Sequence, residues 1–255
     1  LMMALSAGAD DTNIVTCPIL AAGARDKAMD SHIGAAGVQP GAIWINKTGR
    51  RFANEGTAEN IGDIGPLYGK QPDGIVWSVL DQANIDRLAE NGSEISIGEF
   101  VVFGRPLDRL RMELDQDVAD GVAFAANTPE ELAEKIGVSP ENFAATVAAY
   151  NEACAAGDDK EFFKQEKYLR PLSIPPFYAV ALATGTMGSA GGIRINGNMQ
   201  VVDKDYEPIP GLYAVGLDAT GLYGDSYNME VPGAANGFAH TSGRIAGRHF
   251  AAQQA

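Results

Sequence analysis

The sequence predicts an α+β fold, and three observations lead to that prediction. Strand-like apolar runs and helical segments alternate irregularly along the 255 residues, unlike the regular succession of a doubly wound sheet. Two helices in the middle of the chain carry complete start and stop signals. The last third shows short strands between Gly, Asn and Pro turns, followed by one long helix.

The N-terminal part of the chain predicts a helix and a hairpin. Residues 1–9, LMMALSAGA, predict a short helix that stops at its glycine. Residues 41–55, GAIWINKTGRRFANE, predict a strand, a turn and a second strand, with Gly49 at the turn position that favours positive φ. On that second strand we expect Arg50 and Arg51 to face solvent.

The middle of the chain begins with a strand and a helix. Residues 73–81, DGIVWSVLD, predict a strand that leads into a helix capped by Asp81. Residues 95–118 are ambiguous, because FVVFG fits a strand whereas PLDRLRMELDQ has helical spacing. Residues 121–128, GVAFAANT, predict another short strand.

Two helices with clear caps follow. Thr128 caps the first, Pro129 takes its first position, Glu131 closes a capping box and Gly137 ends it. The second repeats the device, with a serine cap, a proline start and an apolar stripe formed by Phe143, Val147, Tyr150 and Cys154. The next segment, DDKEFFKQ, is predicted to be a polar link with an aromatic anchor.

The C-terminal third predicts short strands and one helix. Residues 175–185, PPFYAVALATG, predict an edge-type strand after a rigid Pro-Pro pair, and residues 191–216 predict three short strands. A Gly-rich loop over 217–233 shows no periodicity. Residues 234–253 predict a helix whose small first residues suit an N-terminus that approaches another group closely.

Composition excludes several function classes. A net charge of −14 argues against nucleic acid or an anionic membrane surface as the main partner. Cys17 and Cys154 lack paired or metal-type spacing and the three histidines are scattered, so we expect free or buried thiols and no metal. The chain has no run of 18 apolar residues, so we expect no direct membrane insertion.

The opening residues, LMMALSAGADD, lack the basic region and cleavage site of a signal peptide. They are typical of a helix already under way, so we expect the chain to begin inside a larger protein. The sequence leaves the cellular compartment, the electron donor and the oligomeric state open.

Several segments together resemble the fumarate reductase/succinate dehydrogenase flavoprotein family. GGIRINGNMQVVDKDYEPIPGLYAVG, PGAANGF and SGRIAG resemble the closing segment of that family. GAIWINKTGRRFANE resembles the start of its capping domain, and PEELAEKIGV through PPFYAV resembles the rest. The resemblance is collinear and covers almost the whole chain. The Gly-rich loop also resembles, more loosely, that of the 3-ketosteroid dehydrogenases.

The resemblance implies a domain organisation and a reaction. Residues 42–183 would form the capping domain, and residues 1–41 with 184–255 the distal part of a FAD-binding domain. The complete protein would be a FAD-dependent oxidoreductase that moves hydride between the flavin and a C=C bond of a small substrate. No G-x-G-x-x-G phosphate-binding turn occurs in the sequence. We therefore expect a C-terminal fragment that binds no FAD and is inactive by itself.

The resemblance also implies the residues that contact the cofactor. The start of the last helix would face the flavin with unpaired N–H groups, through Gly233, Ala234, Ala235 and Asn236. The family places an acid just after the glycine that here is Gly216; strict register puts Leu217 there, and Asp218 serves if the loop shifts by one residue. The alternatives are a helix packed closely on the hairpin and an ordinary loop aspartate.

At the substrate side this sequence departs from the family. The proton-donating arginine of the fumarate reductases falls on Glu59, and their second substrate-gripping arginine falls on Glu230. Their Glu…Arg relay and their histidine fall on uncharged residues, and the remaining gripping positions match the motif GTMG; these positions are Ala35, Val38, Gly185, Thr186 and Met187.

We therefore expect a neutral or cationic substrate, not a dicarboxylate, with Glu59 or Tyr227 as the proton donor. As an acid, Glu59 would need a raised pKa, which burial near Glu230 would supply. Tyr223, Tyr227 and Asn228 lie in the Gly-rich loop, where they would form a pocket wall or merely anchor the loop.

Two alternatives stay open beside the fumarate reductase-like enzyme. One is a 3-ketosteroid or enone dehydrogenase that uses the loop tyrosines, and the other is a cofactor-free binding module. A G-x-G-x-x-G turn upstream of the chain would eliminate the binding module.

Overall fold

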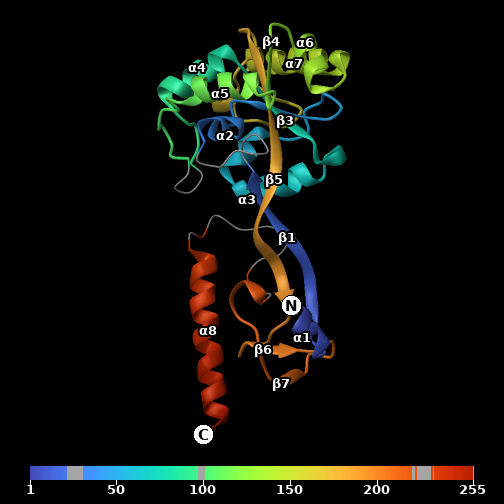
Figure 1. The fold of residues 1–255 in the computed structure, drawn as a ribbon, viewed down its shortest axis with the longest axis vertical. Helices are drawn as coiled ribbons and strands as arrows, with labels where there is room; N and C mark the ends of the chain where they lie inside the picture. Colours follow the sequence, from blue (N-terminus) through green and yellow to red (C-terminus); the bar gives the residue numbers. More distant parts are fainter. Residues whose placement is uncertain (22–30, 97–100, 220–221, 223–230, 232, 255) are drawn as a thin grey trace. The chain divides into compact units, whose positions relative to one another are not determined.

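The computed structural model spans residues 1–255 and describes them all except 22–30, 97–100, 220–221, 223–230, 232 and 255; for residues 12–21, 61–62 and 183–190 it describes the backbone. The chain folds into two compact units. Unit 1 comprises Leu1–Ile19 and Thr186–Ala255, and unit 2 comprises Leu20–Gly185. The chain leaves unit 1 within strand β1 and returns to it within strand β5 (Figure 1).

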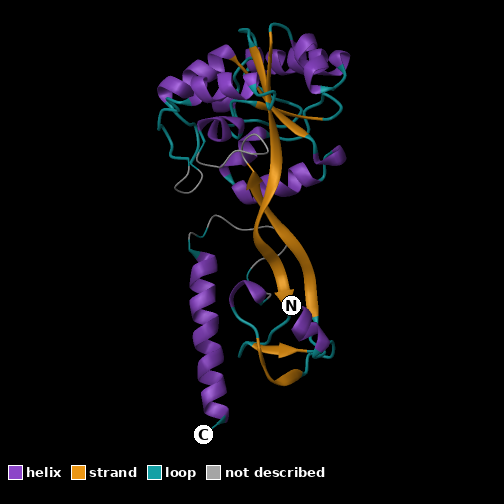
Figure 2. Ribbon diagram, viewed as in Figure 1, coloured by secondary structure: helices purple, strands orange, loops and turns teal. Residues whose placement is uncertain are grey.

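The main sheet has the strand order β1-β5-β3-β2, and β4 also pairs with β5. Residues Val76–Asp81 of β3 and Ala123–Ala126 of β4 each pair antiparallel with the first part of β5. The remaining strands are β1 Asp11–Ala21, β2 Ile43–Asn46 and β5 Phe177–Ile193. Figure 2 shows the helices of unit 2 on both sides of these strands in that view.

The prediction of an edge strand over residues 175–185 was wrong. Strand β5 is internal, since β3 and β4 flank its first residues, and it continues to Ile193. The two prolines precede Phe177, the first paired residue, so they remove no donor from the ladder. Ala179 and Val180 point to opposite faces and are both buried, which is the environment of a central strand.

Helices α6 and α7 cover one face of this sheet. Their apolar residues, among them Leu132, Phe143 and Val147, share one core with strand residues such as Ile43 and Val79. The helices of unit 2 are α2 His32–Gly37, α3 Ile61–Gly69, α4 Gln82–Asn91, α5 Leu110–Ala119, α6 Pro129–Ile136 and α7 Pro140–Ala156. In the ambiguous 95–118 region, the helical interpretation is therefore confirmed for α5.

The predicted cap residues Asp81, Thr128 and Ser139 are confirmed, whereas Glu131 accepts from the Asn127 amide at 3.2 Å, one residue before the cap predicted for the capping box. Asp81 accepts a hydrogen bond from the Asn84 amide at 2.9 Å, and its second oxygen accepts from the amides of Ser173 and Ile174. Thr128 and Ser139 cap α6 and α7, each with proline at the first position, and Gly137 ends α6 in the left-handed region. Such caps satisfy backbone donors that a helix leaves unpaired at its start.

Unit 1 joins the two ends of the chain. The Asp10 amide donates to the Val202 carbonyl at 2.9 Å, and the Arg194 amide donates to the Asp10 carbonyl at 3.0 Å. Unit 1 has a small apolar core. It contains Ala4 of α1, Ile193 at the end of β5 and Val201 of β6. Besides parts of β1 and β5, unit 1 contains α1 Met2–Ser6, β6 Gln200–Val202, β7 Pro208–Tyr213, the 3₁₀ turn η4 Gly216–Asp218 and α8 Ala234–Gln253.

The predicted domains, residues 42–183 and residues 1–41 with 184–255, stay a prediction, and the compact units have other bounds. Residues 31–41, predicted to belong with the FAD-binding remnant, lie in unit 2 with helix α2. The assignment of residues 42–183 to a capping domain stays a prediction. Within the part of the chain that the structure describes, no helix has the length and apolar character needed to cross a membrane.

Candidate active site

The segment after β2 carries a buried ion pair. Only Arg51 bridges back to Ile45, so the predicted second strand is reduced to one residue pair. The Arg51 side chain is 3% exposed, and its Nε and Nη2 atoms donate to the two oxygens of Glu55 at 3.0 and 2.7 Å. The prediction that Arg51 faces solvent was wrong; the adjacent Arg50 is exposed. Neighbouring residues in extended backbone point to opposite sides, so a register of one residue decides which arginine is buried.

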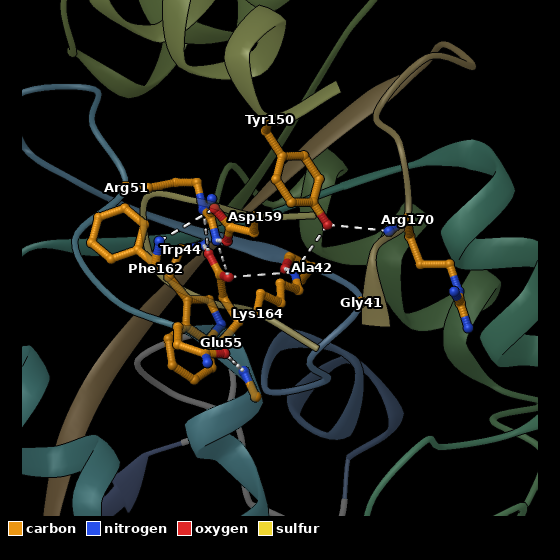
Figure 3. A network of polar contacts seen from close by, with 12 residues as sticks. Gly41, Ala42, Trp44, Arg51, Glu55, Tyr150, Asp159, Phe162, Lys164 and Arg170 are labelled. Atoms are coloured by element: carbon orange, nitrogen blue, oxygen red, sulfur yellow. Dashed lines mark hydrogen bonds and ion pairs between the residues drawn. The ribbon is translucent and has the colours of Figure 1, made fainter. Parts of the chain in front are cut away.

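A second cation and a second carboxylate complete this network (Figure 3). Arg51 also donates to Asp159 at 2.9 Å. Lys164 Nζ lies 3.3 Å from Glu55 Oε2, the oxygen that also accepts from Arg51 Nη2, and donates to Tyr150 Oη at 2.9 Å. The network therefore contains two cations and two carboxylates inside unit 2, and each charge has an opposite partner, as burial requires.

The network keeps its carboxylates ionised. Burial alone would raise the pKa of Glu55, but the charge of Lys164 and the hydrogen bonds from Arg51 outweigh it, so that pKa is lowered. The same balance of burial against the Arg51 hydrogen bond lowers the pKa of Asp159. Burial lowers the pKa of Lys164 against the attraction of Glu55. The backbone amide of Trp44 donates a further hydrogen bond to Glu55 at 3.0 Å.

Glu59, predicted to lie at the family's proton-donor position, ends the short 3₁₀ turn η1 Glu55–Glu59. Tyr168 donates its hydroxyl hydrogen to Glu59 Oε1, and Lys167 Nζ lies 2.9 Å from the same oxygen. The Glu59 side chain is 46% exposed. The hydrogen bonds from Tyr168 and then Lys167 lower its pKa.

The expectation of a raised pKa at Glu59 was therefore wrong. Hydrogen bonds from Tyr168 and Lys167 stabilise the ionised carboxylate, and they outweigh the desolvation that favours the acid. The arrangement supports a hydrogen-bond acceptor at this position. Whether Glu59 takes part in catalysis stays a prediction.

The other substrate-side positions divide into two groups. Ala35 is buried in α2, and Val38 is buried at its C-cap. For Gly185, Thr186 and Met187 the structure describes only the backbone of β5. The predicted loop residues lie outside the described part of the chain; they are Tyr223, Tyr227, Asn228 and Glu230.

In unit 1, the turn η4 packs against helix α8. The Gly216 amide donates to Ser242 Oγ at 3.0 Å, and Ser242 is the buried residue of α8. Leu217 and Asp218 are both exposed, so either is accessible to a ligand. A Cβ atom at Gly192 would lie 2.6 Å from the Asp218 carbonyl oxygen, so the backbone of η4 depends on that glycine.

At the start of helix α8 the Ala234 amide donates to the Val231 carbonyl at 3.1 Å, and the Gly237 amide donates to the Gly233 carbonyl at 2.8 Å. Its N-cap is Gly233, in the left-handed region at φ 80°, and no side chain of the described residues caps the helix. Ala234 and Ala235 are half-buried and Asn236 is exposed. A helix start favours an electron-rich group, and an exposed aspartate accepts hydrogen bonds from hydroxyl or N–H groups. Their contact with a cofactor stays a prediction.

Sequence reasoning missed the residues that hold these sites in place. Tyr168 and Lys167 contact Glu59, and Asp159 and Lys164 contact the buried pair, yet the segment around them was interpreted as a polar link. A weak signal was present, because its aromatic anchor Phe162 lies under the Arg51 guanidinium, 4.9 Å from the ring centroid. Ser242 gave no signal beyond its place among small helical residues.

A comparison with models of protein families shows the family to which the chain belongs. The family model described as "FAD binding domain" matches residues 1–233. The chain therefore belongs to this family of FAD-binding proteins, and its resemblance to the fumarate reductase flavoproteins is confirmed.

The chain is also similar to individual proteins and solved structures. A vinyl phenol reductase of Lactiplantibacillus plantarum is 38% identical over 220 residues, which cover 85% of this chain and 44% of that protein. The open conformation of a flavocytochrome c3 fumarate reductase has 26% identity and a TM-score of 0.56, and the match covers 96% of this chain and 38% of that one. The 3-ketosteroid Δ1-dehydrogenase of Sterolibacterium denitrificans, at 23% identity with a TM-score of 0.68, covers 98% and 46% and shows the same fold. The chain thus spans less than half the length of these relatives.

Proposed function

We propose that this chain contributes the substrate-capping domain and the distal FAD-binding part of a flavin-dependent reductase. The enzyme would act on the C=C bond of a small substrate that is not a dicarboxylate. The observation that carries the proposal is the family match over residues 1–233, combined with a carboxylate, Glu59, where the fumarate reductases place their arginine. The capping domain would close over the substrate and exclude water.

The cofactor would be FAD, which when bound supplies hydride transfer at its N5 atom. The residues proposed to hold its flavin and ribityl end are Gly216, Asp218 and the α8 start over 233–236. The chain has no glycine-rich turn for the pyrophosphate. Losing several charge-assisted contacts of about 1.5–3 kcal/mol each should abolish tight binding by this chain alone. Flavin absorbance that co-elutes with the purified 255-residue chain would contradict this and refute the cofactor-free alternative as well.

The substrate is proposed to be neutral and to carry a hydrogen-bond donor. A dicarboxylate needs cations, since an unpaired buried carboxylate costs several kcal/mol. The corresponding positions hold no cation; they are Ala35, Val38, Glu59, Gly185 and Glu230. The lowered pKa of Glu59, caused by its hydrogen bonds, supports an acceptor for a hydroxyl or N–H group.

A phenol with a conjugated vinyl group, the type of compound named for the Lactiplantibacillus relative, has this chemistry. A carboxylate that accepts the hydrogen bond of the phenolic hydroxyl increases electron density in the ring, so the terminal vinyl carbon accepts a proton more readily. The benzylic carbon then becomes the hydride acceptor, and the phenol keeps its own proton. Under this proposal Glu59 is the hydrogen-bond acceptor that polarises the phenol, and Tyr227 remains the predicted donor of the proton to carbon.

The test uses the complete protein with a reduced viologen as electron donor. We expect turnover of a vinyl phenol, no turnover of fumarate, and roughly 100-fold lower turnover of the phenol in Glu59→Gln, within the range for general acid–base groups. Glu134→Gln, an exposed glutamate in α6, is the matched control and should behave as wild type. Substantial fumarate turnover that survives Glu59→Gln would overturn the proposal. Turnover of a 3-ketosteroid instead would favour the dehydrogenase alternative.

A further inference from the structure

Residues 163–168, here called the strap, run alongside the turn that ends in Glu59. The contacts follow the same order along both segments: Asn54 Nδ2 donates to the Phe163 carbonyl at 3.0 Å, Lys164 Nζ lies 3.3 Å from Glu55 Oε2, and Lys167 Nζ and Tyr168 Oη reach Glu59 Oε1. One continuous segment thus contacts the residue before the turn, Asn54, its buried first residue, Glu55, and its last residue, Glu59.

Two further observations show that the strap is closely fitted to the turn. Phe163 has φ 56°, in the left-handed region that bulky residues rarely adopt, although its side chain is 79% exposed and gains little from packing. Its strained backbone directs its carbonyl to Asn54. At Gly56 a Cβ atom would lie 2.2 Å from Gln165 Oε1, so the end of that strap side chain lies directly against the turn.

Tyr168 is the fixed partner of Glu59. Tyr168 is 4% exposed, so its ring is held by its surroundings, and its hydroxyl donates directly to Glu59. Lys167, the other group in contact with this carboxylate, has a side chain that is 60% exposed and lies over the Tyr168 ring at 4.4 Å. Solvent screens an exposed lysine, and its long side chain orients a partner weakly. The buried hydroxyl therefore determines where the carboxylate oxygen lies.

We propose that Tyr168 is a positioning residue, which holds the Glu59 carboxylate in one orientation at the end of a turn that the strap keeps in place. The geometric part stands on the contacts above, whereas its catalytic consequence rests on the proposed function of Glu59. Tyr168 would act through Glu59 without touching the substrate.

The first experiment measures Glu59 itself in the 255-residue chain. Carboxyl ¹³C NMR of glutamate-labelled protein, with the Glu59 signal assigned by Glu59→Gln, gives its titration midpoint. We expect Tyr168→Phe to raise this midpoint, because the lost hydrogen bond favours the charged form. The matched control is Tyr178→Phe, which loses a comparable hydrogen bond to Gln82 at 2.7 Å in the same unit and should leave the Glu59 midpoint unchanged. An unchanged midpoint in Tyr168→Phe would overturn the proposal.

The second experiment measures kcat/KM for a vinyl phenol in the complete protein. We expect roughly a tenfold loss in Tyr168→Phe, the lower end for a hydrogen bond to a charged group, with kcat more affected than KM. Tyr178→Phe should stay within about twofold, and equal losses in both variants would indicate a merely structural role and refute positioning. If Tyr168→Phe shifts the Glu59 midpoint but Glu59→Gln leaves turnover intact, the positioning holds and the proposed catalytic role of Glu59 fails.

Discussion

Replacing Arg51 by methionine should destabilise unit 2 more than any change at a neighbouring surface position. Arg51 makes two hydrogen bonds to Glu55 and one to Asp159, and its side chain is 3% exposed. In Arg51→Met, Lys164 would be the one cation left for two buried carboxylates. Breaking a buried ion pair by removing one partner costs about 3–5 kcal/mol.

Urea unfolding followed by tryptophan fluorescence measures this cost in unit 2 alone. Both tryptophans, Trp44 and Trp77, lie in unit 2, and Trp44 is fully buried beside Glu55. With a slope of about 2 kcal/mol per molar urea, the midpoint should fall by roughly 1.5–2.5 M. The melting temperature should fall by roughly 6–20 °C.

Two further variants make the experiment decisive. Arg50→Met removes the adjacent, exposed arginine, whose side chain donates to Asn142 at 3.1 Å, and should cost less than about 0.5 kcal/mol. Arg51→Lys keeps the charge but loses the forked geometry, so its cost should be intermediate. If Arg51→Met destabilises unit 2 no more than Arg50→Met, the network does not stabilise the fold and the reasoning is refuted.

Three other outcomes follow from local geometry. Folding lowers the pKa of Glu55 and that of Asp159, so both carboxylates stabilise the folded state at pH values above their ordinary pKa values of 4.5 and 3.8. This stabilisation is lost as the pH falls toward the folded pKa values. Acid titration of the tryptophan signal should show the loss, and a flat profile would contradict it. Gly192→Ala should destabilise unit 1 by about 2–4 kcal/mol because of its backbone clash and positive φ, whereas Gly197→Ala, in open space, should be nearly neutral by circular dichroism melting. Asp81→Ala should cost about 2–4 kcal/mol through loss of a cap and two loop contacts; a cost below 1 kcal/mol would show that the loop is held elsewhere.

Local chemistry made much of this fold predictable. The caps of α4, α6 and α7, the left-handed Gly49 and the bounds of α8 depend on residues close in sequence, and each was predicted correctly. The family could also be inferred, because its closing segment consists of turns and glycines whose order is visible in the sequence. The same comparison identified Glu59 as a departure from the fumarate reductases.

Register and long-range pairing were not predictable in this way. Strand β5 was expected at an edge because prolines precede it, yet which strands flank it depends on β3 and β4, which lie far away in sequence. Arg51 was expected in solvent because one residue of register decides its side, and its partner Asp159 is 108 residues away. A one-residue shift reverses the exposure of every side chain in extended backbone.

The sequence by itself determined the family, the α+β class, the helix ends and the residue types at the substrate side, since these depend on neighbouring residues and on an ordered set of motifs. The direction in which the pKa of Glu59 shifts depends on the tertiary structure alone. Glu59 was expected to be an acid raised by burial, but Tyr168, 109 residues away, donates to it and lowers its pKa. A pKa depends on whichever groups the fold brings within hydrogen-bond distance, and a sequence does not list those groups.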